Sequence, residues 1–213
     1  ADVFIVDRAT GLTTLVSRHS NGTIGDDYSI LPKISADGRW VVFVSNARNL
    51  TDTAPVCCRQ VYAHDRQSGQ TTLISRNAQG ESGNGPSTYP APSADGRFIA
   101  FESEAANLVE DDANGGGIDG IDVYLFDWQT LDLSIVSRSG DGTQGNMSSV
   151  IPSISADGRF IAFQSWATNL VAGPSTGWPN IYVRDRLMNQ TTLVSRHSDG
   201  TPGDYVSHGA SIS

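Results

Sequence analysis

The sequence has little lysine, little cysteine and no long apolar run, and each shortage excludes a class of protein. No apolar run approaches the ~20 residues that a helix needs to span a bilayer. Lys33 is the one lysine, and the net charge is −9. This acidic balance argues against a nucleic-acid backbone or an anionic membrane surface as the partner.

The two cysteines, Cys57 and Cys58, are adjacent. Neighbouring Cα atoms lie about 3.8 Å apart across a trans peptide, which is below the usual disulfide range. A strained vicinal ring, a bond to another chain and two free thiols all remain open.

What the sequence does contain favours short strands joined by tight turns. Hydrophobic residues make up 38% and charged residues 17% of the 213 residues, which argues against disorder, and 22 residues are glycine. No window shows an apolar period of 3.6, and β-branched residues dominate, so a helical fold is excluded.

Three markers recur in one register along the chain. The pentapeptide Ser-Ala-Asp-Gly-Arg occurs three times, and its aspartates are 58 and 62 residues apart: Asp37, Asp95 and Asp157. An aspartate closes an apolar run at Asp7, Asp65, Asp127 and Asp185. A Ser-Arg pair follows at Ser17, Ser75, Ser137 and Ser195. Internal repetition of this period indicates a repeat architecture.

Each repeat contains four strand-like runs. The Asp-Gly of the pentapeptide supplies the positive φ angles of a hairpin between the first two. The second run, such as "RFIAF", is continuously apolar, so both of its faces should be buried. The turn between the third and fourth runs contains Gly11, Gly69, Leu131 or Asn189 at one equivalent position. Glycine and asparagine suit a left-handed conformation and leucine does not, so we expect the Leu131 hairpin to turn differently.

Repeated four-stranded antiparallel units with doubly buried strands predict an all-β fold, a β-propeller of blades packed around an axis. The phase of the repeat divides the chain into strands three and four of a split blade (1–20), three full blades (21–78, 79–140 and 141–198) and the first strand of a next blade (199–213). Three explanations of this incomplete ring remain open. The chain is a segment of a longer propeller, it closes a four-bladed ring with one strand absent, or another copy completes it strand to strand.

The unit P-x-x-S-x-D-G-R followed by two apolar residues and Ala-Phe resembles the repeats of TolB-type, WD-repeat-like β-propellers of bacterial envelope and secreted proteins. The linker G-x-x-G-[DN]-x-x-S-x-x-P, at 22–32, 80–90 and 142–152, is similar to that of a secreted subgroup. The resemblance covers the whole chain. It implies the propeller fold and a secreted or envelope location, and family members include partner-binding modules and enzyme appendages.

One acidic, glycine-rich loop is the candidate metal site. Its oxygen ligands at alternating positions are those that Ca²⁺ requires, although no bidentate glutamate closes the loop. The predicted calcium ligands are Asp112, Asn114, Asp119 and Asp122. No other cofactor is expected. Asparagine-linked glycosylation patterns begin at Asn21, Asn49, Asn146 and Asn189.

No catalytic residue is predicted. The inner strands around the axis carry no acid, so the paired carboxylates of a polysaccharide-active propeller are unsupported. The Gly-x-Ser-x-Gly match at 173–177 lies in a loop rather than in a strand-turn-helix context. Trp128 is the best candidate for an exposed stacking platform. We therefore expect a secreted, non-catalytic interaction scaffold, with an extracellular filament or surface-layer subunit and a carbohydrate-binding propeller as alternatives. The expected partners are other copies, adjoining blades or a glycan.

Overall fold

The computed structural model describes residues 1–173 and 177–213, and its regular elements are antiparallel strands. A two-stranded sheet, β1 (Phe4–Val6) and β2 (Thr13–Leu15), comes first. Three four-stranded meanders follow. Blade 1 comprises β3 (Ser29–Ile34), β4 (Trp40–Ser45), β5 (Gln60–Asp65) and β6 (Gln70–Leu73). Blade 2 comprises β7 (Ser87–Pro92), β8 (Phe98–Ser103), β9 (Asp122–Asp127) and β10 (Asp132–Ile135). Blade 3 comprises β11 (Ser149–Ile154), β12 (Phe160–Ser165), β13 (Asn180–Asp185) and β14 (Gln190–Leu193).

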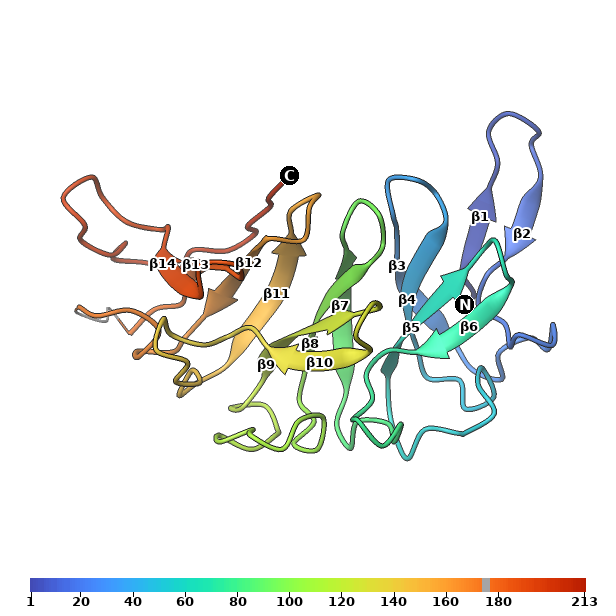
Figure 1. Cartoon of the computed structure of the whole chain (residues 1–213), viewed down its shortest axis with the longest axis horizontal. Coiled ribbons are helices and arrows are strands. Elements are labelled where there is room, and N and C mark those ends of the chain that lie inside the picture. The colour runs from blue at the N-terminus through green and yellow to red at the C-terminus, as the bar shows by residue number, and fades with distance from the viewer. Residues whose placement is uncertain (174–176) are drawn as a thin grey trace.

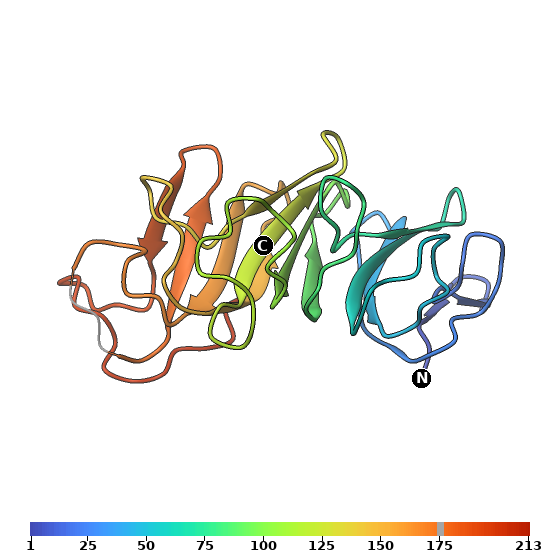
Figure 2. The same ribbon diagram turned by 90° about the horizontal axis from the view of Figure 1, so that it is seen from below.

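The sheets stand side by side in chain order as the blades of an incomplete β-propeller (Figure 1). Seen from below, they form an open row that does not close into a ring (Figure 2). The first strands of the blades, β3, β7 and β11, lie next to one another and are the inner strands. The predicted fold class is therefore confirmed. No helix in the described part of the chain has the length and apolar character needed to cross a membrane.

The hydrophobic core lies between the blades. Successive side chains of a strand point to opposite faces, so a continuously apolar strand serves two interfaces. In β4, Val41 and Phe43 pack toward the β1–β2 sheet, whereas Val42 and Val44 pack toward blade 2. The same division holds for β8, which contributes to the interfaces on both sides of blade 2. This is why the second run of each repeat has no polar face.

The repeated pentapeptide forms a hairpin turn that is tied to the third strand of its own blade. In blade 1, Asp37 accepts hydrogen bonds from the Ser35 hydroxyl and the Arg39 N–H. Arg39 then donates from Nε and Nη2 to the two carboxylate oxygens of Asp65, at 2.9 and 2.8 Å. The guanidinium also lies over the ring of Trp40. Equivalent two-bond pairs join arginine and aspartate in the other blades, at Arg97–Asp127 and Arg159–Asp185.

The pentapeptide turns also join one blade to the next. The Ala36 N–H donates to the Ala94 carbonyl at 2.8 Å, and the Ala94 N–H donates to the Ala156 carbonyl at 3.0 Å. Gly96 of blade 2 packs against the ring of Trp40 of blade 1, and Gly158 of blade 3 packs in the same way against Phe98 of blade 2. The repeated pentapeptide therefore has two structural functions. It closes a hairpin within its own blade, and it packs against the neighbouring blade.

The hairpin at Leu131 does not turn differently, so that expectation was wrong. Leu131 has a φ of 61°, close to 75° at Gly69 and 53° at Asn189. The Leu131 N–H donates to the Asp127 carbonyl at 2.8 Å, and the Asp127 carboxylate accepts the Gln129 N–H. These bonds hold the left-handed conformation against its steric cost of about 1–2 kcal/mol.

Residues 199–213, predicted as the first strand of a next blade, form no strand in the structure. The segment nevertheless keeps the path of an inner strand. The Ser207 N–H donates to the Pro179 carbonyl, as the Ser149 N–H of β11 donates to the Ile121 carbonyl. The described residues offer no second strand to pair with it, so no ladder forms.

Candidate functional site

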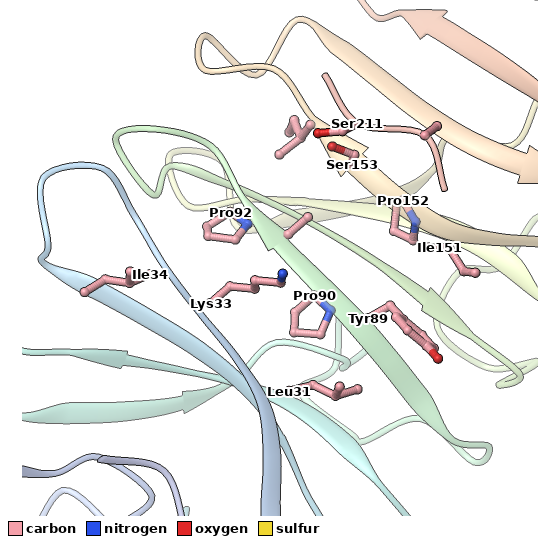
Figure 3. A pocket seen from close by; sticks show the side chains of 13 residues that line it. Leu31, Lys33, Ile34, Tyr89, Pro90, Pro92, Ile151, Pro152, Ser153 and Ser211 are labelled. Carbon is pink, nitrogen blue, oxygen red and sulfur yellow. The ribbon is translucent and has the colours of Figure 1, made fainter. Parts of the chain in front are cut away.

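The inner strands line an open groove of about 460 Å³ (Figure 3). Leu31 and Lys33 come from β3, Tyr89 from β7 and Ile151 from β11, so each blade contributes the same strand. The C-terminal segment contributes Ala210 and Ser211 to one end of the groove. The sequence predicted inner strands around an axis, and the structure turns their faces toward one shared space.

A bulge in each inner strand sets the direction of the groove side chains. The register of every inner strand shifts at this point. Leu31, Tyr89 and Ile151 have φ angles of 52°, 51° and 52°, and each precedes a proline. Their side chains remain 37, 45 and 36% exposed. A left-handed conformation is unusual for these residue types, and Ile151 is β-branched, so the fold holds strained residues at the groove surface.

The equivalent residue in the C-terminal segment is Gly209, with a φ of 74°. Glycine adopts this conformation without steric cost. The left-handed backbone conformation therefore recurs even where the residue has no side chain. In the three blades an apolar side chain occupies this position. The sequence offered one signal for this position, the proline that follows it in all three blades.

One buried carboxylate lies beneath the groove, on the second strand of blade 2. Glu102 of β8 accepts hydrogen bonds from the Thr88 hydroxyl and, across the blade boundary, from the Ile151 N–H at 2.7 Å. Burial raises the pKa of Glu102. Glu102 lies on a second strand rather than on an inner strand, so the acids predicted from sequence did not include it. Its equivalents in the other blades are Val44 and Gln164, and that difference was the available signal.

Three of the four predicted calcium ligands surround one point, but a side-chain nitrogen of the protein occupies that point. The Gln144 side-chain Nε2 lies 3.0 Å from Asp112 Oδ1, 2.9 Å from Asn114 Oδ1 and 2.6 Å from Asp122 Oδ2. Asp119 is exposed and makes no hydrogen bond to the described residues. Within those residues, no group of three or more histidine, cysteine, aspartate or glutamate side chains could hold a metal ion. Calcium binding stays a prediction.

Asp122 also has a structural function that the repeat reveals. The Ser137 hydroxyl donates to its Oδ1, just as the Ser75 hydroxyl donates to Gln60 and the Ser195 hydroxyl donates to Asn180. Blade 2 thus places an acid where the other complete blades place an amide. Asp122 is fully buried, and this burial raises its pKa to about 6 from the ordinary 3.8.

The raised pKa of Asp122 predicts a stability that falls as the pH rises. Between pH 4 and 6 the folded chain holds the proton that the unfolded chain has lost, so Asp122 costs about 3 kcal/mol of unfolding free energy above pH 6. Asp122→Asn should therefore gain stability relative to the wild type across this range, as measured by urea unfolding at each pH. Asp119→Asn, at an exposed position, is the control. If the difference in unfolding free energy between Asp122→Asn and the wild type stays constant between pH 4 and 6, the pKa of Asp122 is not raised.

The remaining sequence candidates are separate from the groove. Cys57 and Cys58 are joined to each other by a disulfide bond in the loop between β4 and β5. Among the predicted glycosylation sites, Asn49 is half-buried and donates from Nδ2 to the Ile24 carbonyl. The other three sites are exposed: Asn21, Asn146 and Asn189. Attachment of a glycan stays a prediction.

Trp128 is not an exposed platform, which corrects the expectation from sequence. It stacks on Trp40 of blade 1 with ring centroids 4.6 Å apart and meets Phe126 edge-on at 5.1 Å. It is half-buried at the boundary between blades 1 and 2. The Gly-x-Ser-x-Gly match at 173–177 includes residues 174–176, which lie outside the described residues.

Comparison with known proteins concerns the fold of the chain. No family model and no curated protein matches the chain. Among solved structures it is similar to the tricorn protease, with a TM-score of 0.52 and 15% identity, over 85% of this chain and 15% of that one. It is also similar to the β-propeller domain of the Trilobed protease from Pyrococcus furiosus, with a TM-score of 0.48 and 16% identity, over 79% of this chain and 43% of that one. TolB from Acinetobacter baumannii has a TM-score of 0.41 and 16% identity, over 90% of this chain and 48% of that one.

This chain therefore spans less than half the length of each of these three proteins. At such identities a likeness shows the fold alone. The chain is a β-propeller with four-stranded blades, and its open row of blades is an incomplete propeller.

Proposed function

We propose that the chain is a non-catalytic interaction module that binds an extended polypeptide segment of a partner in the groove between its inner strands. The observation that carries this proposal is the repeated bulge. Leu31, Tyr89 and Ile151 are held in a strained conformation that leaves their apolar side chains exposed toward one space. Strain of this kind concentrates at functional sites, and bulges re-aim side chains there.

The chemistry of the groove favours a polypeptide over a charged small molecule. Prolines of the inner strands remove backbone N–H donors from the groove edge. Most of the lining side chains are apolar, and the remaining polar surface includes the ammonium of Lys33, so the groove offers both apolar and polar contacts. The C-terminal segment already illustrates such a contact, because the Ile212 N–H donates to the Ser153 hydroxyl at 3.2 Å. An extended segment with apolar side chains at alternate positions matches this surface.

A catalytic function receives no support from the groove residues. Glu102 is a carboxylate beneath the inner strands, and both of its oxygens accept hydrogen bonds within the protein. A polysaccharide-active propeller would need a pair of carboxylates across a substrate. Secretion and self-assembly into a filament or layer stay predictions. The exposed Phe4 and Val6 on β1 favour an apolar contact at that sheet edge.

Glycine in place of the bulge side chains should separate binding from folding. We expect peptides selected from a displayed random library to bind the wild type and to lose about tenfold or more in affinity for the Tyr89→Gly/Ile151→Gly double variant. The unfolding free energy should change by no more than about 1 kcal/mol per site, because relief of strain offsets lost burial and added chain entropy.

Two controls make the result specific. Val56→Ser removes an exposed apolar side chain away from the groove and should leave peptide affinity unchanged. Val150→Gly lies beside the bulge in regular strand conformation and should destabilise the protein more than Ile151→Gly does. Peptides that bind the double variant as tightly as the wild type would exclude the groove as the binding site.

A further inference from the structure

A second cavity, of about 610 Å³, lies between blades 2 and 3 and is rich in arginine. It is bounded by the β10 side of blade 2 and the β13 side of blade 3. Three arginines line it against a single carboxylate: Arg138, Arg184, Arg186 and Asp111. We propose that this cleft binds a small tetrahedral oxyanion, a phosphate or sulfate group. The inference is independent of the groove and of its proposed partner.

The centre of the cleft is Arg184, a buried guanidinium with no carboxylate partner among the described residues. Arg184 is 7% exposed. Its Nη1 donates to the Ser139 carbonyl at 2.9 Å and to the Thr191 hydroxyl at 3.1 Å, and its Nη2 donates to the Asn189 side-chain oxygen. All of these acceptors are neutral. The Nε–H and one Nη2 N–H make no hydrogen bond to the described residues, so two donors remain for a ligand.

The fold does not need a cation at this position. The equivalent residues of the other blades are Val6, His64 and Phe126. Burial lowers the pKa of His64, and its Nδ1 lies 2.9 Å from the Thr71 hydroxyl, in the same contact that Arg184 makes with Thr191. Burial of an uncompensated charge is costly, so a charge that packing does not require points to a ligand that neutralises it.

The nearby carboxylates are already paired. Asp111 accepts from Arg138 Nη2 at 2.6 Å, and Asp185 accepts the two-bond pair from Arg159. Arg186 donates from Nε to the Gly158 carbonyl and lies over the Phe98 ring. Its terminal nitrogens form no ion pair with an acid among the described residues. The cleft is therefore a positive site on a chain of net charge −9. Guanidinium groups match the oxygen geometry of phosphate and sulfate, which fits the proposed ligand.

The test measures anion binding to the whole chain at pH 8. Equilibrium dialysis against inorganic phosphate, and separately against sulfate, should give saturable binding of one ion per chain. Thermal unfolding at matched ionic strength in chloride should show a saturable rise of the midpoint by about 5–10 °C at a hundredfold excess over Kd. A general salt effect would instead grow without saturation.

The matched variant is Arg184→His, because His64 already occupies this position in blade 1. It should fold as the wild type does, judged by circular dichroism, and should lose the saturable binding by at least about tenfold, as the loss of a charged bond implies. Arg76→Ala, the repeat-equivalent of Arg138 in another cleft, should bind as the wild type does. An adventitious ion only, meaning no saturable binding or equal binding by Arg184→His, would overturn the proposal. If Arg184→His does not fold, the wild-type protein decides. Saturable binding of one ion per chain supports the proposal, and the absence of saturable binding overturns it.

Discussion

Replacing Gly96 with alanine should cost about 3 kcal/mol or more of unfolding free energy. An alanine Cβ at this position would lie 2.3 Å from the Trp40 Cδ1 atom, and the backbone has a φ of 70°. The ring cannot move away easily, because Trp40 also stacks on Trp128. The substitution therefore combines an unfavourable backbone conformation with a clash at the boundary between blades 1 and 2. Urea unfolding followed by tryptophan fluorescence would measure the loss.

Gly38 provides the matched control for Gly96. It occupies the same turn position with a φ of 72°, but the nearest atom to an added Cβ is Arg66 Nη1 at 3.7 Å. Gly38→Ala should therefore cost only the backbone part, about 1–2 kcal/mol. Gly158→Ala should resemble Gly96→Ala, because its Cβ would lie 2.2 Å from the Phe98 Cδ2 atom. If Gly38→Ala and Gly96→Ala lose the same unfolding free energy, these turns do not help to pack one blade against the next.

Removal of the Asp65 carboxylate should destabilise blade 1 by about 2–3 kcal/mol. The Asp65 side chain is 8% exposed and accepts both bonds of Arg39, the Gln67 N–H and the Ser68 hydroxyl. Asp65→Ala leaves these donors without their acceptor at the end of β5. The more exposed Arg39 can reach water, which limits the loss. Chemical unfolding at pH 7 would measure it.

The pH dependence of Asp65→Ala gives a second readout. Hydrogen bonds from Arg39 hold the pKa of Asp65 well below its ordinary value of 3.8. A depressed folded pKa contributes stability above the unfolded pKa, and that stability is lost as the pH falls toward the folded pKa. The wild-type advantage over Asp65→Ala should therefore be full at pH 5 and shrink below pH 4.

The control for Asp65 is Asp7→Ala. Asp7 closes the equivalent strand and accepts the Ala9 and Thr10 N–H groups, but no arginine bonds to it among the described residues. Its replacement should cost clearly less than that of Asp65. If the two substitutions cost the same, turn capping rather than the arginine pair accounts for the repeated aspartate.

The sequence alone determined the blade architecture, because its signals are local. The Asp-Gly turn, the aspartate at the strand end and the continuous apolar run each act within one repeat. A fixed spacing then assigns them to equivalent strands. Local propensity was insufficient at Leu131, where bonds from Asp127 outweigh the preference of leucine against a left-handed conformation. It was also insufficient for residues 199–213, because a strand needs a paired neighbour as well as a suitable sequence.

Only the tertiary structure decided what the repeats do to one another. Gly96 and Trp40 come from different blades, as do Glu102 and the Ile151 N–H, and no spacing within a repeat predicts such contacts. The groove exists because bulges turn three inner strands toward a shared space, and the arginine cleft exists because Arg184 faces the preceding blade. The physical reason is that burial and charge pairing depend on which surfaces meet, whereas turns and strand alternation depend on neighbours along the chain.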